Sequence, residues 1–352
     1  MRYQAALIIP IAALLATCNS QPPSAQAGKP TAAVTGSTQT ATSALLNTPP
    51  ARFGSAMAFD EADQMVVLFG GQGLAGYLND TWTWNGTGWT EEHPRLSPSP
   101  RYDAQMAYDA TNKAVVLLGG IGNLSSSQIG DLGDTWIWNG ASWKEEHPMV
   151  SPPPRHGSSL ASDGASGQVV LFGGDSGVRA PVFLNDTWSW NGGTWDKRNP
   201  ASSPPARANA TMAYDDAARQ LLLFGGSSGI ALGDTWVWDG RSWTRRAPSL
   251  SPSPRYAAAA EYSASDKKLV LFGGYGGYSG SRLSETWAWD GQTWLQLYPS
   301  KQPPARVYAS LSRGPADGLL LFGGSGDARK GVHGELSDTW SWQTATWRAA
   351  GT

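Results

Sequence analysis

From residue 49 onward, short apolar runs alternate with polar turns in a pattern that recurs six times, about every 50 residues. In the first repeat this pattern predicts four strands, at residues 52–59, residues 65–70, residues 81–85 and from Trp89 onward. The first turn, at residues 60–64, is polar, and the next contains Asn85-Gly86, a pair that suits a tight hairpin. Asn-Gly or Asp-Gly recurs there in four of the other five repeats, whereas the sixth has Gln343-Thr344. A period of this length indicates an array of small stacked β units.

Each repeat carries the same landmarks in the same order. An arginine begins the first strand, Gly-Gly ends the second, an acid-Thr-Trp-x-Trp segment forms the third, and one more tryptophan begins the fourth. The arginines are Arg52, Arg101, Arg155, Arg207, Arg255 and Arg306, and the acids are Asp80, Asp134, Asp186, Asp234, Glu285 and Asp338. All 18 tryptophans belong to this pattern, three in each repeat. Trp82 and Trp84 point to one face of their strand, so we expect neighbouring units to stack and bury them.

Four strands per unit, with Gly-Gly after the second, resemble the kelch repeat, and the resemblance extends over residues 49–348. Kelch repeats form the blades of β-propellers, so the resemblance implies an all-β fold: a six-bladed β-propeller of kelch repeats with four antiparallel strands per blade. In such a meander the arginines, the Gly-Gly pairs and the variable loops between the second and third strands lie at one end of the blades, which we call the top face. The sixth repeat contains its own fourth strand. Ring closure therefore rests on packing between the first and last blades, or on an added edge strand from residues 43–48.

The top face holds the candidate ligand-binding residues, because binding residues usually lie on loops held by a rigid scaffold. In some ligand-binding kelch domains the position of the six arginines helps line the central pocket. The resemblance therefore implies that the six arginines are candidate contacts for an anion or a sugar: Arg52, Arg101, Arg155, Arg207, Arg255 and Arg306. The alternative, which the sixfold regularity favours, is that each arginine forms a structural ion pair with the acid of its repeat. Four residues near the axis differ from repeat to repeat: Tyr102, His156, Tyr256 and Tyr308. They are candidates for stacking on a sugar ring or binding a peptide, and the alternative is that they only fill the mouth of the central channel.

Motifs for catalysis or metal binding are weak. Residues 71–76 match G-x-G-x-x-G, but no helix pattern follows them, and G-x-S-x-G at residues 225–229 lacks a strand–turn–helix context. No compact chelating spacing joins His93, His147, His156 and His333, so we predict no metal, no cofactor and no catalytic residue. Galactose oxidase, a kelch-type enzyme, has a copper site with a tyrosine crosslinked to a cysteine. The only cysteine here is Cys18, near the N-terminus, which excludes that chemistry.

Composition and charge narrow the class of protein. The 42 glycines and 24 prolines disfavour a largely helical fold, and 40% apolar residues exclude a disordered chain. The chain has 26 basic and 28 acidic residues without a basic run, so nucleic acid is not an expected partner.

The N-terminus predicts export. Residues 1–17 contain Arg2 and a 12-residue apolar stretch, too short to span a bilayer and typical of a signal peptide. Residues 15–18 resemble the lipobox of bacterial lipoproteins, which implies a lipidated Cys18. Residues 18–48 would then be a flexible tether and residues 49–352 the propeller. The alternative is cleavage after Ala27, which releases a secreted or periplasmic soluble protein.

Together these features predict a lipid-anchored binding module of the cell envelope that recognises a carbohydrate or a protein through its top face. Its contact with the membrane is the lipid anchor alone. Binding is favoured over catalysis because no catalytic set is found. The alternatives are a sugar-acting envelope enzyme of the epimerase or mutarotase type, for which kelch proteins that isomerise sialic acid are a precedent, and a structural scaffold of an envelope complex.

Overall fold

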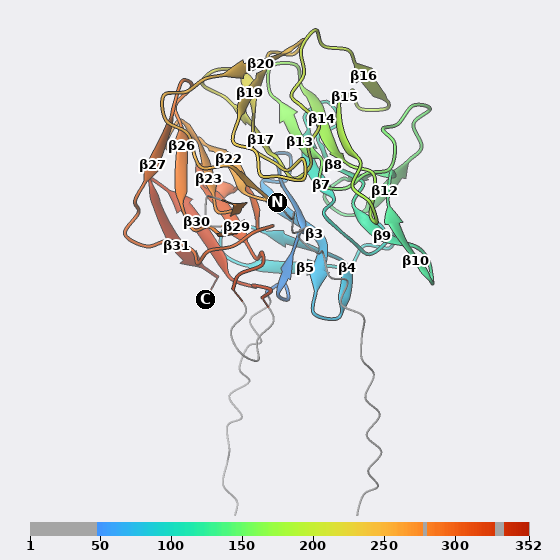
Figure 1. The fold of residues 1–352 in the computed structure, drawn as a ribbon. Helices are drawn as coiled ribbons and strands as arrows, with labels where there is room; N and C mark the ends of the chain where they lie inside the picture. The colour runs from blue at the N-terminus through green and yellow to red at the C-terminus, as the bar shows by residue number, and fades with distance from the viewer. Residues whose placement is uncertain (1–47, 277–279, 328–333, 352) are drawn as a thin grey trace, which may run out of the picture. The chain divides into compact units, whose positions relative to one another are not determined.

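Apart from one 3-10 turn at Pro315–Asp317, the regular secondary structure of the described residues is all β-strand. The computed structural model describes residues 48–276, 280–327 and 334–351 (Figure 1). The chain divides into the units Met1–Ala44 and Leu45–Thr352, and all described residues belong to the second. The predictions for the signal peptide, Cys18, the Ala27 cleavage site, the tether up to residue 47 and His333 lie outside the described residues. Within the described ranges, no helix is long and apolar enough to cross a membrane.

Six antiparallel meanders of four strands follow one another along the described chain, and we number them blades 1 to 6. Blade 1 comprises β2 (Ala56–Asp60), β3 (Met65–Gly73), β4 (Gly76–Trp84) and β5 (Trp89–Glu92), and blade 2 comprises β7 (Gln105–Asp109), β8 (Ala114–Leu118), β11 (Thr135–Trp138) and β12 (Trp143–Glu146). Blade 3 comprises β13 (Ser159–Asp163), β14 (Gln168–Asp175), β15 (Phe183–Trp190) and β16 (Trp195–Arg198), and blade 4 comprises β17 (Thr211–Asp215), β18 (Gln220–Phe224), β19 (Thr235–Trp238) and β20 (Trp243–Arg246). Blade 5 comprises β22 (Ala259–Ser263), β23 (Lys268–Phe272), β26 (Thr286–Trp289) and β27 (Trp294–Leu297), and blade 6 comprises β28 (Ser310–Arg313), β29 (Leu319–Phe322), β30 (Thr339–Gln343) and β31 (Thr346–Ala350). Short strands at the top face are β1 (Arg52–Phe53), β6 (Arg101–Tyr102), β9 (Ile121–Ser125), β10 (Gln128–Asp131), β21 (Arg255–Tyr256), β24 (Tyr275–Gly276) and β25 (Ser281–Arg282).

The first strands of the blades surround a common axis. β2, β7, β13, β17, β22 and β28 contact one another in that order, and β28 contacts β2, so the described meanders form a closed cycle. Each of these strands pairs with the second strand of its blade in the same register, for example Ala56 with Phe69 and Gln105 with Leu118. The prediction of an all-β fold with four antiparallel strands per repeat is confirmed. The closed cycle is the arrangement that a propeller requires.

Tryptophan side chains join the blades. The first tryptophan of every blade donates through Nε1 to the acid two residues earlier, as Trp188 does to Asp186 at 2.7 Å. The third tryptophan donates to a threonine of the preceding blade, as Trp195 does to Thr135 at 3.0 Å. The same bond joins Trp89 to Thr339, so packing between blades 1 and 6 closes the cycle.

Two features of the strand connections differ from the prediction. β3 and β14 continue past their Gly-Gly pairs into hairpins with β4 and β15, with a register shift between Phe69 and Gly71 and between Phe172 and Gly174. The first glycine of every pair has a φ of 62–70°, so this backbone conformation does not distinguish the two strands from the other four. In the turn after β4 only Gly86 has a positive φ, of 99°. Asn85 contributes instead through Oδ1, which accepts hydrogen bonds from the amides of Thr87 and Gly88.

A matched pair of substitutions measures the value of one buried indole hydrogen bond. Trp190 donates to Oδ2 of Asp109 at 3.0 Å, and Asp109 is fully buried. The equivalent Trp289 is as deeply buried, but its Nε1 has no acceptor among the described residues. Trp190→Phe and Trp289→Phe remove the same atoms, but only the first deprives Oδ2 of a buried carboxylate of its donor; Oδ1 keeps the amides of Thr111 and Asn112. We therefore expect it to lower the free energy of unfolding by about 1–3 kcal/mol more. Urea unfolding followed by tryptophan fluorescence measures both losses, and equal losses would contradict the expectation.

Candidate ligand-binding site on the propeller axis

The six arginines at the top face are buried and fully engaged. In blade 3 Arg155 is 1% exposed, and its Nη1 and Nη2 donate to the two carboxylate oxygens of Asp186 at 2.7 and 2.9 Å. Its Nε and Nη1 also donate to the carbonyls of Pro153 and Gly173, both at 3.0 Å. The other repeats have equivalent ion pairs of 2.5–2.7 Å: Arg52–Asp80, Arg101–Asp134, Arg207–Asp234, Arg255–Glu285 and Arg306–Asp338.

These ion pairs hold the top of each blade together. Burial alone would raise the pKa of the six carboxyls, but the hydrogen bonds and the charge of the arginines outweigh it and lower each pKa. Each arginine links the start of the first strand to the Gly-Gly end of the second and to the third. Every guanidinium nitrogen of the six has a protein partner, which is the arrangement that the structural interpretation requires. The bonded geometry therefore favours a structural role over direct ligand contact.

A ring of backbone hydrogen bonds surrounds the axis at the top face. Its members are the residues two positions after each arginine: Gly54, Asp103, Gly157, Asn209, Ala257 and Tyr308. Each amide donates to the carbonyl of the member in the preceding blade, at 2.6–3.2 Å, and the amide of Gly54 closes the ring on Tyr308. All six have φ between 52° and 62°, a region that favours glycine, yet four of them carry side chains.

Three of these side chains, which come from blades 2, 4 and 6, meet on the axis. When the amide nitrogen of Asn209 faces Asp103, it lies 3.2 and 3.3 Å from the two carboxyl oxygens. The other atom of the amide lies 3.4 Å from the hydroxyl of Tyr308. Asp103 is 6% exposed. Burial raises the pKa of Asp103 to about 6; nearby His156 opposes this shift and Asp175 adds to it. We call Asp103, Asn209 and Tyr308 the axial cluster.

Aromatic rings lie next to the axial cluster. The ring centroid of Phe53 lies 6.0 Å from that of Tyr102 and 6.1 Å from that of Tyr308. Tyr102 also stacks on Tyr77, with 5.3 Å between centroids. The structure thus brings Tyr102 and Tyr308 together through Phe53. The third predicted tyrosine, Tyr256, packs against Tyr275, with 5.4 Å between ring centroids.

His156 is held by a carboxylate. Its Nδ1 lies 2.6 Å from Oδ1 of Asp131, the last residue of β10. An Nδ1–H donated to Asp131 leaves Nε2 as an acceptor. Sequence reasoning had found His156 but had missed Asp131, Asp103 and Asn209. A signal existed for the last two, because they replace glycine at a fixed distance from the repeat arginine.

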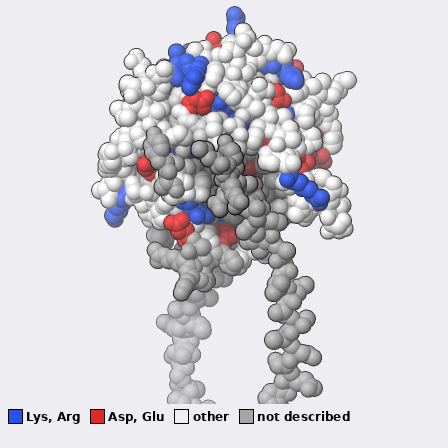
Figure 2. Space-filling model, viewed as in Figure 1, with Lys and Arg blue, Asp and Glu red and all other residues white. Residues whose placement is uncertain are grey.

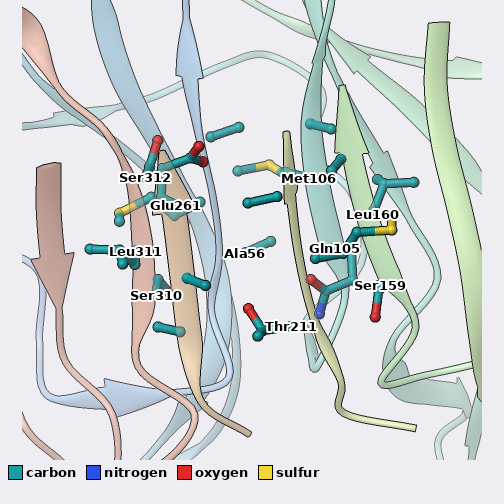
Figure 3. A pocket seen from close by; sticks show the side chains of 18 of the residues that line it. Ala56, Gln105, Met106, Ser159, Leu160, Thr211, Glu261, Ser310, Leu311 and Ser312 are labelled. Carbon is teal, nitrogen blue, oxygen red and sulfur yellow. The ribbon is translucent and has the colours of Figure 1, made fainter. Parts of the chain in front are cut away.

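An axial cavity of about 260 Å³ extends from the ring along the first strands of all six blades (Figure 3). The axial cluster lines its end at the ring. Glu61 and Asp216 line the opposite end, and both are exposed residues in the turns after β2 and β17. The cavity therefore reaches the surface opposite the top face, an opening that the sequence interpretation did not anticipate.

Arg313 spans three blades at this open end. It donates to the carboxylate of Asp216 in blade 4, and its Nε lies 3.8 Å from Glu261 in blade 5. Its guanidinium carbon lies 5.7 Å from the ring centre of Tyr262. Burial raises the pKa of Glu261, and the charge of Arg313 partly offsets this. The open end is therefore a charged network at the edge of a mostly small-residue wall.

Charges elsewhere are dispersed. Figure 2 shows lysine and arginine side chains scattered between aspartates and glutamates over the visible face. In the part of the chain that the structure describes, no group of three or more His, Cys, Asp or Glu residues is arranged to hold a metal ion. Among the described residues, the unlike polar side chains that lie close together are therefore those on the axis.

Comparisons with known proteins agree with this architecture. A solved structure described as "Structure of YjhT" is similar, with a TM-score of 0.66 and 18% sequence identity, over 86% of this chain and 98% of that chain. At this identity the likeness concerns the fold. No curated protein matches the sequence significantly. Residues 165–350 match the KLHDC2/KLHL20/DRC7 Kelch-repeats domain. Because this match covers more than half of the chain, the protein belongs to the kelch-repeat family.

Proposed function

We propose that this chain is an exported, lipid-anchored kelch propeller that binds a carbohydrate at its top face, next to the axial cluster. One observation carries the proposal. The arginine pairs of the top face repeat in all six blades, whereas the axial cluster combines a carboxyl, an amide and a hydroxyl from three different blades. Recognition of one ligand needs unlike groups at defined positions, and these groups meet on the axis.

The chemistry of the site favours a sugar. Hydroxyl groups of a sugar both donate and accept, so they match the carboxyl of Asp103 and the amide of Asn209. The rings of Phe53 and Tyr102 supply apolar faces beside these polar groups, and small-molecule sites combine such surfaces with a few well-placed polar atoms. His156, whose ring is fixed by Asp131, adds a further polar group near Asp103.

Glycan-array binding tests the proposal directly. The fragment of residues 43–352 should bind a subset of glycans, and Tyr102→Ala or His156→Ala should weaken that binding at least tenfold, as expected when a recognition residue loses about 1.4 kcal/mol or more. Tyr298→Ala is the matched control, because Tyr298 is 83% exposed and lies outside the axial site. Glycan binding that neither top-face variant changes would contradict the site. A pull-down that recovers a protein ligand while the array shows no glycan would contradict the ligand class.

The anchor is tested separately. Mass spectrometry of the mature N-terminus should find a lipidated Cys18, because residues 15–18 resemble a lipobox. A mature chain that begins with unmodified Gly28 would show cleavage after Ala27 instead.

A sugar-acting enzyme is a second candidate, favoured by one observation. The pKa of Asp103 is raised to about 6, first of all by burial, and His156 lies close enough to affect it. A carboxyl that titrates near neutral pH is suited to general acid–base chemistry. NMR of each bound sugar would detect turnover, and turnover that disappears in Asp103→Asn would favour the enzyme over the binding module.

A further inference from the structure

The first strand of blade 5 departs from the other five blades at two adjacent positions. At the fifth residue after the arginine blade 5 has Ala260, where the other blades have Met57, Met106, Leu160, Met212 and Leu311. At the next position blade 5 has Glu261, where the others have Ala58, Ala107, Ala161, Ala213 and Ser312. The pairing register is the same in all blades, as Ala260 with Leu271 and Met212 with Leu223 show. The two exchanges therefore change the wall of the axial cavity without changing the blade.

Glu261 belongs to a network in which charges of both signs are already paired. Its Oε1 accepts the amide of Tyr262 at 2.8 Å, and Arg313 lies between it and Asp216. A charged ligand would have to compete with one of these partners. A neutral ligand with hydroxyl groups can donate to Glu261 and leave its pairing with Arg313 in place.

Two polar side chains deeper in the cavity have no protein partner. Thr211 is 8% exposed, and neither its hydroxyl nor the amide of Gln105 makes a hydrogen bond to a described residue. Figure 3 shows both side chains extending into the space between the strands. By contrast, the hydroxyls of Ser159 and Ser310, in the same wall, donate to backbone carbonyls of a neighbouring blade at 2.8 and 2.7 Å. Both side chains are open to the water of the cavity, because neither is among the fully buried polar atoms without a partner, and a bound hydroxyl group can take the place of that water.

We propose that the axial cavity binds one small, neutral, polyhydroxylated molecule, a monosaccharide or a similar polyol. The ligand enters at the open end past Glu261 and bonds to Gln105 and Thr211. The cavity volume of about 260 Å³ lies below the range of about 300–1,000 Å³ that accommodates drug-sized ligands, which limits the ligand to about one sugar ring. This site goes beyond the top-face site, because the backbone ring and the axial cluster lie between the two.

The full chain, titrated with glucose, galactose, mannose and N-acetylglucosamine, tests this site by calorimetry and ligand-observed NMR. At least one of these sugars should bind, and Gln105→Ala and Thr211→Val should each weaken its binding about three- to tenfold. Ala260→Met gives blade 5 the side chain that three other blades carry, so we expect it to fold, to occupy the space and to abolish binding. Gln292→Ala, at an exposed turn, is the control for Gln105→Ala and should leave the affinity unchanged.

The outcomes separate this site from the top-face site. Urea midpoints establish whether Ala260→Met is folded, and if it is not, Gln105→Ala and Thr211→Val decide. Failure of all four sugars to bind, or binding that none of the cavity variants weakens, would overturn the cavity site. Binding of these four sugars that is retained in Ala260→Met but lost in Tyr102→Ala would overturn it too, while supporting the proposed function.

Discussion

Replacing Arg155 with methionine lowers the free energy of unfolding by about 3–5 kcal/mol, the range for removing one partner of a buried ion pair. The guanidinium is 1% exposed and satisfies both oxygens of Asp186 and the carbonyls of Pro153 and Gly173. Methionine fills a similar volume but donates to none of them. The variant therefore removes the charge partner and two donors of the Asp186 carboxylate, which keeps only its bond from Trp188 among side chains, and it removes the guanidinium donor from two carbonyl groups.

Urea unfolding at pH 7 measures this loss, with Arg95→Met as the control at an exposed position, where we expect a change within about 0.5 kcal/mol. The pH dependence gives a second readout. Because the folded pKa of Asp186 is lowered by Arg155, its contribution to stability is complete above the unfolded pKa of about 3.9 and is lost as the pH falls through the lower folded value. The difference between wild type and variant should therefore shrink in acid. A loss below about 1 kcal/mol at pH 7 would contradict the structural role of the pair.

Asp103→Asn should act in the opposite direction and raise the free energy of unfolding at pH 7 by about 1–3 kcal/mol. Burial raises the folded pKa of Asp103 to about 6, so ionisation above that pH opposes folding. This cost is complete above the folded pKa and disappears as the pH falls toward the unfolded value of about 3.9. Asparagine keeps the shape, and it tolerates the φ of 59° at this position.

Chemical unfolding of wild type and Asp103→Asn between pH 4 and pH 8 checks the expectation. The two stabilities should converge near pH 4 and separate through pH 6. Asp196→Asn, at an exposed position, is the control and should differ from wild type by less than about 0.5 kcal/mol. A constant difference across the range would show that the carboxyl of Asp103 does not ionise in the manner expected from its burial.

A destabilising carboxyl on the axis fits a binding role. The ring positions favour glycine, and Gly54 and Gly157 show that glycine is accommodated there. Asp103, Asn209 and Tyr308 instead hold side chains at positive φ, which costs of order 1–3 kcal/mol for each strained residue. Binding sites often retain groups that are suboptimal for stability. If Asp103→Asn is more stable and binds sugar less well, both expectations hold together.

The regular features were predictable because they repeat. Six copies of each landmark made the four-stranded unit and the tryptophan pattern visible, and the indoles of Trp89 and Trp195 bond to the preceding blades as a stacked array requires. The sequence also allowed the arginine–acid pairing to be considered, since every repeat has an arginine and an acid at the positions of Arg155 and Asp186. The ends of β3 and β14 were not predictable, because the Gly-Gly pair has the same positive φ in every repeat and only in these two does a single strand continue through it.

The axial groups escaped prediction for the opposite reason, since each occurs once. Asp103 and Asn209 are separated by two blades in sequence and meet only across the axis. Arg313 reaches from blade 6 to Asp216 in blade 4 in the same way. Aligning the repeats would have marked these positions as exceptions, but the alignment alone does not show that they face one another.

The sequence by itself determined the repeating unit and the all-β class, because short-range patterns of hydrophobicity and turn residues dictate strands and hairpins. It favoured the pairing of each arginine with an acid of its own repeat but left ligand contact as an alternative. Only the tertiary structure decided which groups share the axis, that the cavity is bounded by the backbone ring and the axial cluster at the top face, and that it opens at the other end beside Glu261 and Arg313. The physical reason is that each blade contributes one first strand to the axis. The contacts across it therefore join residues that no local pattern connects, and closing the cycle of blades is what brings them together.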